Sequence, residues 1–408
     1  KINFNNIFCK LLKFILKTQK NTINIIINKE QGMIYLDNAA TTRISEKAVA
    51  AMEPYLNERY GNPSGIYNLA KISKKVVEDT RGKIANAINA KPENIFFTSG
   101  GTESDNWVLD NAQNFGRQII TSKIEHHAIL NKCASLEKKG MRVSYIGTDR
   151  YGMVNPYDIE SAIDGDTALI SVMFANNEVG TIEPIGAIGK IARKRNIIFH
   201  TDAVQAFCHV PIDVEEDNID LLSASSHKFH GPKGVGFLYV RNPKKMQPFI
   251  YGGSQERSKR AGTENVVGIV GMGAAIQETI ENLSARMEKE RNLRDYLIER
   301  VLGEIPCTRL NGHPTKRLPG NANFTIAGID GTSLVVLMDN DNICVSSGSA
   351  CSAGNDAPSH VIKAIGIPDS YAYGTIRITL CADNTKEEID YTISRLKENV
   401  KMMREQMG

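Results

Sequence analysis

Short apolar runs alternate with helical patterns along most of the chain after residue 33. Seven runs predict strands, at residues 95–98, 118–122, 142–146, 168–174, 197–201, 219–224 and 235–240. Most are continuously apolar, as in strands buried on both faces of a mostly parallel sheet. Amphipathic stretches lie between several of them, for example the one with Ile72, Val76, Ile84 and Ile88 at multiples of four. This alternation predicts an α/β architecture with helices on both faces of the sheet.

The pattern changes after about residue 268. A long helical stretch follows, and its apolar stripe consists of Ile269, Ile276, Ile280, Leu283, Met287 and Leu297. Shorter strands are then predicted at residues 322–327, 334–338, 343–346 and 375–380. The last helix begins at a capping box formed by Thr385 and Glu388. Its apolar positions step by four and three, at Ile389, Ile393, Leu396, Val400 and Met403. We therefore expect a second, smaller α+β domain.

Residues 1–32 differ in composition from the rest of the chain. They contain six Lys and a single acidic residue, so this segment carries a charge of +5 and the remainder carries −2. Asn24 interrupts its apolar run, which is too short for a signal peptide. No stretch of the chain is apolar enough to span a membrane. We interpret the segment as an extension translated from an A/T-rich upstream region. An organellar presequence is the alternative, which the absence of Arg disfavours.

Composition narrows the class of protein. The 408 residues suffice for two or three domains, and 41% apolar with 23% charged residues exclude a disordered or collagen-like chain. The charge of the main body gives no sign of a nucleic-acid surface. Seven widely spaced Cys, without a C-x-x-C pair, argue against a disulfide framework and a zinc ribbon. We expect a protein of a reduced compartment, the cytoplasm.

Polar residues follow four of the predicted strands, and ligands of open α/β sheets lie beyond the carboxyl ends of the strands. Strand 95–98 runs into a glycine turn, residues 99–104, whose free N–H groups at a helix start can hold a phosphate. Strand 118–122 leads to His126 and His127. Strand 197–201 is followed by Asp202 and, three residues later, by Gln205. Such a carboxylate either caps a helix or faces a cationic ligand atom.

The fourth strand, 219–224, is followed by Ser225, Ser226, His227 and Lys228. A lysine after a buried strand is costly unless it is paired or used. Burial lowers the pKa of such an amine and makes it a nucleophile that can form a Schiff base.

One ligand accounts for all four strand endings. Pyridoxal phosphate (PLP) needs a lysine for its aldehyde, a carboxylate for its ring nitrogen and a phosphate cup at a helix start. Each ending is ambiguous by itself, and the combination is far more specific. A zinc site built from His126, His127 and Cys133 is the competing interpretation, but no further ligand lies at a suitable spacing.

Cys351 lies among small and polar neighbours, in residues 346–354. Such neighbours cannot bury a thiol, so we expect Cys351 on an exposed loop where it can act as a nucleophile. We expect four other cysteines to be small residues of the core: Cys208, Cys307, Cys344 and Cys381.

With these residues assembled, residues 33–408 closely resemble the PLP-dependent cysteine desulfurases of the NifS/IscS type. The matching segments are YLDNAATT (35–42), GNPS (61–64), FTSGGTES (97–104), EHHA (125–128), NNEVG (176–180), HTDAVQ (200–205), SSHKFHGPKG (225–234), RAGTEN (260–265) and SGSACS (347–352). The resemblance implies the fold of type I PLP enzymes (aminotransferase class V), with a large domain around a mostly parallel seven-stranded sheet. It also implies a homodimer that converts L-cysteine to L-alanine and leaves the sulfur on the enzyme as a persulfide.

The resemblance implies roles for individual residues. The catalytic residues are Lys228, bonded to the cofactor, His126, stacked on its ring, and the sulfur-accepting Cys351. The cofactor-binding residues are Gly101, Thr102, Asn177, Asp202, Gln205, Ser225, His227, Lys228 and, from the other subunit, Thr263. Asn38 and Arg377 bind the substrate, and Arg377 grips its carboxylate. No resident metal is implied, with Cys351 contacting a cluster only transiently.

The resemblance also implies an organisation of the chain and a partner. The large domain comprises residues 48–284, and the small domain comprises residues 33–47 and 285–408 with the Cys351 loop. The SGSACS loop resembles the long-loop branch of the family, which can carry a persulfide to an iron–sulfur scaffold or another acceptor protein. The family usually has a His shortly after GNPS, where this chain has Gly65, Ile66 and Tyr67.

Three alternatives stay open from the sequence. A selenocysteine lyase or an aminotransferase of the same fold would use Lys228 and Asp202, and transamination would not need Cys351. A non-catalytic sulfur-scaffold subunit would keep the fold without turnover. The pathway that receives the sulfur is not encoded in these motifs.

Overall fold

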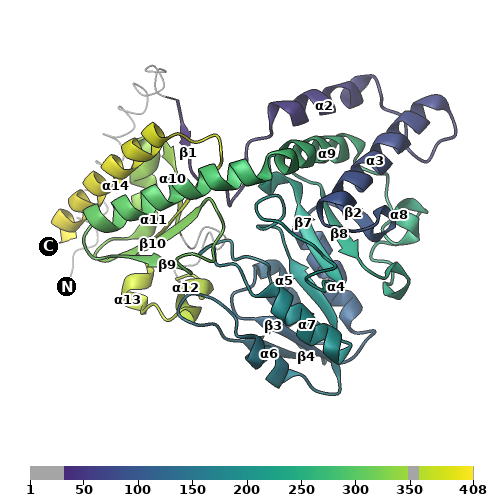
Figure 1. Cartoon of the computed structure of the whole chain (residues 1–408), viewed down its shortest axis with the longest axis horizontal. Helices are drawn as coiled ribbons and strands as arrows, with labels where there is room; N and C mark the ends of the chain where they lie inside the picture. The colour runs from purple at the N-terminus through teal and green to yellow at the C-terminus, as the bar shows by residue number, and fades with distance from the viewer. Residues whose placement is uncertain (1–31, 348–357, 408) are drawn as a thin grey trace, which may run out of the picture.

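A seven-stranded sheet forms the centre of the larger part of the molecule (Figure 1). The computed structural model describes residues 32–347 and 358–407. The strands lie in the order β2 (Ile95–Thr98), β8 (Gly236–Val240), β7 (Leu221–Ser225), β6 (Ile198–Asp202), β5 (Thr167–Ser171), β3 (Gln118–Ser122) and β4 (Arg142–Ile146). Only β8 runs antiparallel to its neighbours in this sheet. The predicted mostly parallel sheet is confirmed.

Helices cover both faces of this sheet. On one face, α4 (Gly101–Ala112) and α5 (His127–Glu137) pack their apolar side chains against Ile119 and Leu169. On the other face, α3 (Asn68–Ala87), α7 (Ile185–Arg195) and α9 (Val266–Glu281) pack against Ile120 and Ile170. Neighbouring residues of one strand thus serve different cores, as the pleat requires. The remaining helices of this part are α2 (Glu46–Asn57), which packs on α9, α6 (Pro156–Ala162) and α8 (Gln255–Ser258).

The apolar stripe predicted for α3 is partly wrong. Ile84 and Ile88 are buried, but Ile72 is 42% exposed. Polar side chains occupy part of the buried face because they find partners there. Arg81 is buried and donates to Glu256 and to the carbonyl of Ile95, so its charge is compensated.

A smaller antiparallel sheet has the order β12 (Ser346–Ser347), β13 (Thr375–Thr379), β10 (Asn321–Ile326) and β9 (Thr308–Asn311). Beside it, β1 (Ile34–Tyr35) pairs in parallel with β11 (Ile343–Cys344). The helices of this part are α10 (Leu283–Glu304), α11 (Gly331–Asn340), α12 (His360–Ala364), α13 (Asp369–Ala372) and α14 (Lys386–Met407).

The prediction for α14 is confirmed in detail. The Thr385 N–H donates to Glu388 Oε2 at 3.1 Å, and the Glu388 N–H donates to Thr385 Oγ1 at 3.2 Å, so the capping box is present. All five apolar positions of the stripe are buried in the core of the smaller sheet.

Three predictions for this part need correction. Residues 334–338 form part of helix α11 and not a strand, because Leu334 and Met338 are buried one turn apart and Asp330 caps the helix by accepting from the Ser333 N–H at 2.7 Å. An apolar run of this length fits a strand and a buried helix equally well. The long helical stretch is two helices, α9 and α10, which meet at Asn282. Strand β9 was not expected.

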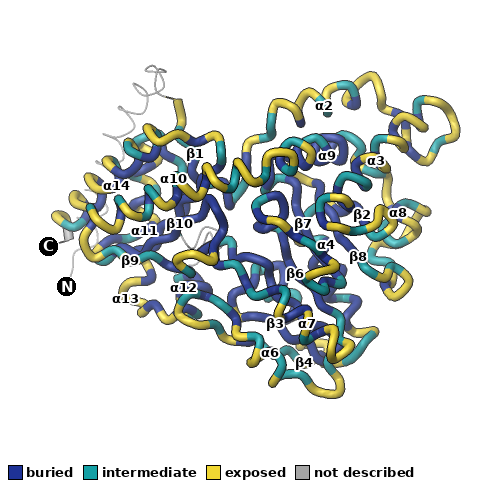
Figure 2. The backbone as a smooth tube through the Cα atoms, viewed as in Figure 1, coloured by how far each residue is buried: buried dark blue, intermediate teal, exposed yellow. Residues whose placement is uncertain are grey.

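Helix α10 runs from the larger to the smaller part (Figure 1), and the buried backbone is concentrated in the two sheets (Figure 2). Leu36 lies in the core of the smaller sheet. The expected domain boundary after residue 284 falls in the first turn of α10. The division into residues 48–284 and residues 33–47 with 285–408 stays a proposal, and the expected extension, residues 1–32, lies almost wholly outside the described residues.

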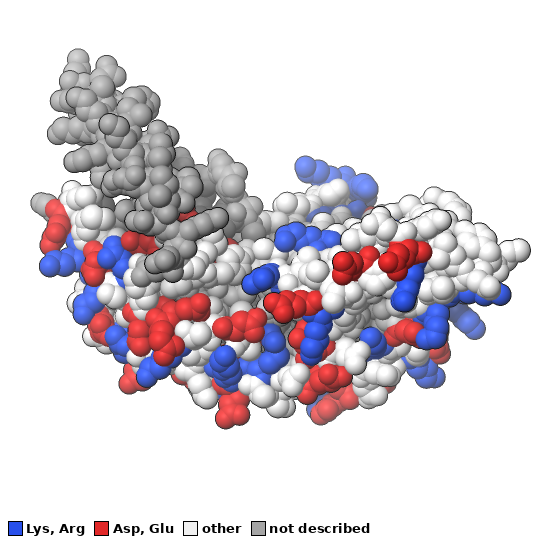
Figure 3. Space-filling model, turned by 90° about the horizontal axis from the view of Figure 1, so that it is seen from above, with Lys and Arg blue, Asp and Glu red and all other residues white. Residues whose placement is uncertain are grey.

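Two further observations concern the surface. None of the helices in the described ranges is long and apolar enough to cross a membrane. On the face shown in Figure 3, acidic and basic side chains are interspersed.

Candidate active site

Five parallel strands end at one cavity of about 580 Å³. It lies at the carboxyl edge of the large sheet, beyond β2, β3, β5, β6 and β7. Ten of the predicted site residues border it: Gly101, Thr102, His126, Asn177, Asp202, Gln205, Ser225, His227, Lys228 and Arg377. The first nine belong to the large-sheet part, and Arg377 comes from β13 of the smaller sheet.

One end of the cavity is built for an anion. The first turn of α4 offers backbone N–H groups that have no partner within the helix. Gly100 precedes it with φ +149°, and a Cβ atom there would lie 3.2 Å from Ser225 Oγ. Only glycine therefore lets this turn come so close to the end of β7. Burial lowers the pKa of His227 to about 4, so this ring beside the turn is neutral.

Lys228 is positioned by the segment that follows β1. Its Nζ donates to the carbonyls of Ala39 and Ala40, both at 2.7 Å. The Lys228 carbonyl faces His209 Nε2 at 2.9 Å. The Thr42 N–H donates to the carbonyl of His227 at 2.8 Å, which holds the same segment against the turn after β7.

Asp202 is the last residue of β6, and it is buried. Its Oδ1 accepts the N–H of Val204 at 2.9 Å. Burial raises the pKa of this carboxyl, whereas His126 and Lys228 lower it. His126 caps α5 by accepting the Ala128 N–H on Nδ1 at 3.1 Å. Burial lowers the pKa of His126, so the neutral ring carries its hydrogen on Nε2.

Arg377 has two of its three nitrogen atoms in use. Nη2 forms an ion pair with Asp37 at 2.8 Å, and Nη1 donates to the carbonyl of Asn177 at 3.1 Å. Nε is buried and has no hydrogen-bond partner within residues 32–347 and 358–407. A buried N–H left without a partner is costly, and beside a cavity it is a donor available to a ligand.

The whole arrangement matches one family of enzymes. Residues 34–392 match the family described as aminotransferase class-V. The chain belongs to this family. Cysteine desulfurase IscS of Methanosarcina thermophila is 49% identical over 382 residues, which cover 93% of this chain and 94% of the relative.

Solved structures of similar proteins agree with this assignment. A NifS-like protein superposes with a TM-score of 0.85 at 37% identity, covering 91% of this chain and 100% of that chain. SspA in complex with cysteine superposes with a TM-score of 0.77 at 35% identity, covering 85% and 98%. The fold is that of type I PLP enzymes, as expected.

Members of this aminotransferase class-V family use PLP, and so does this protein. The described residues fit the cofactor by the chemistry of their donor sets. The α4 turn offers unpaired N–H groups for the phosphate, Lys228 offers an amine for the aldehyde, and Asp202 offers a carboxylate for the ring nitrogen.

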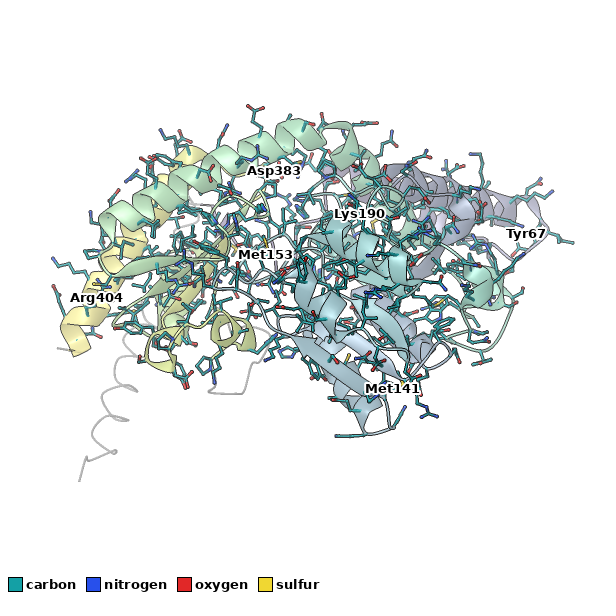
Figure 4. All side chains as sticks on the ribbon, turned by 60° about the horizontal axis from the view of Figure 1, so that its bottom comes forward. Tyr67, Met141, Met153, Lys190, Asp383 and Arg404 are labelled. Atoms are coloured by element: carbon teal, nitrogen blue, oxygen red, sulfur yellow. The ribbon has the colours of Figure 1, made fainter. Side chains whose placement is uncertain are left out.

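Two of the predicted site residues that the structure describes do not border this cavity. Asn38 borders an adjoining cavity of about 30 Å³, where its Nδ2 donates to the Thr379 carbonyl at 2.8 Å; Gln205 borders both cavities. Thr263 is exposed and does not border the cavity of its own chain. Cys351 lies outside the described residues. Tyr67, where the family usually has a His nearby, is exposed at the outer edge of the molecule (Figure 4).

Asp105 borders the cavity and was missed by the sequence analysis. It follows the FTSGGTES motif directly and lies one turn after Gly101 on the same face of α4. Its sequence neighbours Glu103, Ser104 and Asn106 are polar as well, so Asp105 did not stand out in the sequence.

The residues of the alternative zinc site do different things. Cys133 is buried in the core beneath α5, and burial raises its pKa to about 12. The His127 ring lies 4.8 Å from that of His360. In the described part of the chain, no group of three His, Cys, Asp or Glu side chains is placed to hold a metal ion.

Proposed function

We propose that this protein is a cysteine desulfurase, which converts L-cysteine to L-alanine and transfers the sulfur to Cys351 as a persulfide. The observation that carries the proposal is that Lys228, Asp202 and Arg377 border one cavity. This combination provides an amine for the cofactor, a counter-charge for its ring and a cation for an amino-acid carboxylate. Relatives named cysteine desulfurase share nearly half of the sequence over most of its length.

PLP, when bound, supplies the electron sink for the negative charge that forms when the substrate loses its α-proton. The α4 turn, Thr102 and Ser225 bind the phosphate. His227 adds a hydrogen bond and no charge, because its ring is neutral. Asp202 holds the ring nitrogen in its protonated form.

Two side chains move protons in this scheme. Lys228 Nζ takes the α-proton of the substrate and returns it to the substrate later. The His126 ring is neutral and carries its hydrogen on Nε2. This nitrogen can therefore donate a proton, whereas Nδ1 accepts the Ala128 N–H. The fixed Nδ1 contact with Ala128 holds the ring in one orientation at the start of α5.

Arg377 binds the substrate carboxylate through its unpaired Nε and the adjoining Nη2. The ion pair with Asp37 and the bond to Asn177 fix the plane of the guanidinium. A planar cation held in this way binds a carboxylate with two parallel hydrogen bonds.

The sulfur step needs one nucleophile, which we assign to Cys351. Its thiolate attacks the sulfur of the bound cysteine, so that an S–S bond forms and the Cβ–S bond of the substrate breaks. The electron pair of the broken bond stays with the three-carbon fragment, which takes up a proton and leaves as alanine. No outside oxidant is required, and the persulfide remains on the enzyme for an acceptor.

We further propose a two-fold homodimer. An exposed apolar set lies on α2, on α3 and between them, an area of largely exposed backbone in Figure 2. It consists of Val49, Leu56, Tyr60, Ile66, Tyr67 and Ile72. An apolar surface of this kind is typical of an interface. A second copy would also explain why the exposed Thr263 does not serve its own cavity.

The acceptor of the sulfur is proposed to be an iron–sulfur scaffold or another acceptor protein. The cytoplasm is the proposed compartment, and the five described cysteines are all free, which fits a reducing environment.

Substitution of Cys351 tests the sulfur step. We expect Cys351→Ser to bind PLP and cysteine with the parent visible spectrum, while alanine and sulfide release in the presence of a thiol reductant fall by several orders of magnitude. Cys307→Ser is the matched control, because Cys307, which the sequence placed in the core, is in fact an exposed thiol and should be dispensable. Alanine formation by Cys351→Ser at the parent rate would favour the lyase or aminotransferase alternatives.

A further inference from the structure

A row of buried polar side chains crosses the large sheet beneath the cavity. Thr121 of β3 is in register with Ser171 of β5, and Ser171 is in register with His200 of β6. His200 Nδ1 lies 2.9 Å from Ser171 Oγ, and Nε2 lies 3.0 Å from Ser223 Oγ of β7. Burial lowers the pKa of His200 to about 3, so the ring is neutral and adds no positive charge to this row.

Asp105 of α4 lies over this row. Its side chain is buried, and Oδ1 is 3.7 Å from His200 Nε2. Oδ1 has no hydrogen-bond partner in the part of the chain that the structure describes. The residue borders the same cavity as Asp202. The cavity therefore contains two buried carboxyl groups, and the proposed function uses only one of them.

The surroundings of the two carboxyl groups differ. Burial raises the pKa of Asp202 too, but His126, the Val204 N–H and Lys228 oppose this rise. No lysine or arginine of the described residues is among the groups that shift the pKa of Asp105; its titratable neighbours are Asp202, Glu125 and the neutral His200. Burial and the charge of Asp202 raise the pKa of Asp105 well above its usual value, and the Ser223 hydroxyl only partly opposes this rise. Two buried carboxyl groups with unequal partners titrate apart, and the poorly supported one keeps its proton.

Glu125 does not change this balance. It comes from the loop after β3, and it accepts the Ser122 hydroxyl at 2.6 Å and the Met173 N–H at 3.0 Å. Burial raises its pKa to about 8, so it too is mainly neutral at pH 7. Asp202 is then the single negative charge among these three buried acids.

We propose that Asp105 is a second buried carboxyl group of the PLP cavity, held neutral over the Ser223–His200–Ser171 row, so that of the buried acids Asp202 alone presents a negative charge to the cofactor ring. Asp105 acts as a positioning residue through this row and does not react. The inference rests on the proposed use of the cavity for PLP. A second negative charge there would raise the pKa of every nearby group, including the Lys228 nitrogen that is bonded to the cofactor.

A pH titration of the visible absorption of the holoenzyme tests the proposal. Asp105→Asn replaces a neutral acid by a neutral group of the same shape, so the midpoint of the spectral change should equal that of the parent. Asp202→Asn removes a real charge and should lower the midpoint. If Asp105→Asn also lowers the midpoint, then Asp105 is ionised in the holoenzyme and the proposal is wrong.

The hydrogen-bonding part of the proposal has its own comparison. Asp105→Leu cannot bond to the row, and we expect it to weaken PLP binding roughly tenfold, whereas Asp105→Asn keeps the parent affinity. Equal affinity in the Leu variant would show that Asp105 does not position the site.

Infrared spectroscopy separates a failure of this inference from a failure of the proposed function. The C=O stretch of a protonated carboxylic acid should be present at pH 7 and should lose one component in Asp105→Asn and a different one in Glu125→Gln. The infrared band can be measured without activity and without bound PLP. It therefore tests the protonation of Asp105 even if the protein does not use PLP. Absence of any Asp105-dependent component in the protein with and without PLP would overturn the proposal.

Discussion

The two edges of the large sheet carry cavities with opposite characters. At the carboxyl edge, Arg377 leaves its Nε without a partner and Asp105 leaves Oδ1 without one, within the described residues. At the amino edge, a cavity of about 330 Å³ is bordered by Arg193, Asp220, Arg241 and Lys245. There Arg241 donates to Glu215, to the Val214 carbonyl at 2.6 Å and to the Ile219 carbonyl.

The difference lies in whether a buried group is satisfied by the chain itself. The donors of Arg241 are consumed by local carbonyls and by Glu215, so this arginine stabilises the fold. Arg377 extends from the smaller sheet to the cavity, and its contacts with Asp37 and Asn177 leave Nε available for a ligand. Charge alone therefore does not mark a ligand site, whereas an unmet hydrogen-bonding group in a cavity does.

The largest effect is expected for Lys228→Ala. This change removes the amine that we propose bonds to the cofactor, so turnover should fall by at least about 10³-fold and the visible absorption should be lost, with far-UV circular dichroism unchanged. Lys245→Ala is the matched control at the amino edge, where an exposed lysine should be dispensable. Alanine production by Lys228→Ala at the parent rate would contradict the assignment of the carboxyl edge.

Arg377→Lys should come next. Lysine retains the positive charge but cannot form two parallel hydrogen bonds with a carboxylate. We expect kcat/KM for L-cysteine to fall about 10²-fold, equivalent to about 3 kcal/mol, with much of the change in KM. The steady-state kinetics of the same substitution at Arg241 supply the comparison. An unchanged KM for Arg377→Lys would mean that the substrate carboxylate binds elsewhere.

Glu125 gives a pH-dependent contrast. Its pKa in the folded protein, about 8, exceeds the value in an unfolded chain, so the folded state binds the proton more tightly. The resulting stabilisation is complete below about pH 4.5 and is lost as the pH rises through 8, at up to about 1.4 kcal/mol per pH unit. Glu125→Gln should remove this loss. Urea midpoints measured from pH 5 to pH 9 check it, and parallel curves for both proteins would refute it.

The smallest effect is expected for Arg241→Lys. The side chain is about one-fifth exposed, and lysine retains one of its several contacts. We expect a loss of about 1 kcal/mol in the free energy of unfolding and no change in kcat or KM. Calorimetry and steady-state kinetics on the purified variant check both parts. A kinetic defect would show that the amino edge communicates with the active site.

Much of the local structure could be predicted because its causes are local. Helix α14 has a capping box and a regular apolar stripe, and both are present. Residues 334–338 could not be assigned in this way, since an apolar run of five residues satisfies strand and helix alike. The cap at Asp330 decides for the helix, and it lies outside that run.

The chemistry of the site was predictable only in part. The strand endings pointed to Asp202 and Lys228, which both border the cavity, because polar residues after buried strands are conspicuous in a sequence. Asp105 was overlooked, since nothing in the sequence alone says that this face of α4 lies over the row with His200. Likewise, Tyr67 differs from the family pattern, and the structure places it at the surface away from the cavity.

The sequence by itself therefore determined the alternation of strands and helices in the larger part, the residue types of a PLP site and the family resemblance. These follow from periodicity and from motifs, which are properties of neighbouring residues. Tertiary structure alone decided which groups meet. The strand order of the sheet brings residues 100 and 202 to one cavity, and the smaller sheet adds Arg377. It also decided which polar atoms stay unpaired, because burial and partners depend on segments distant in the chain.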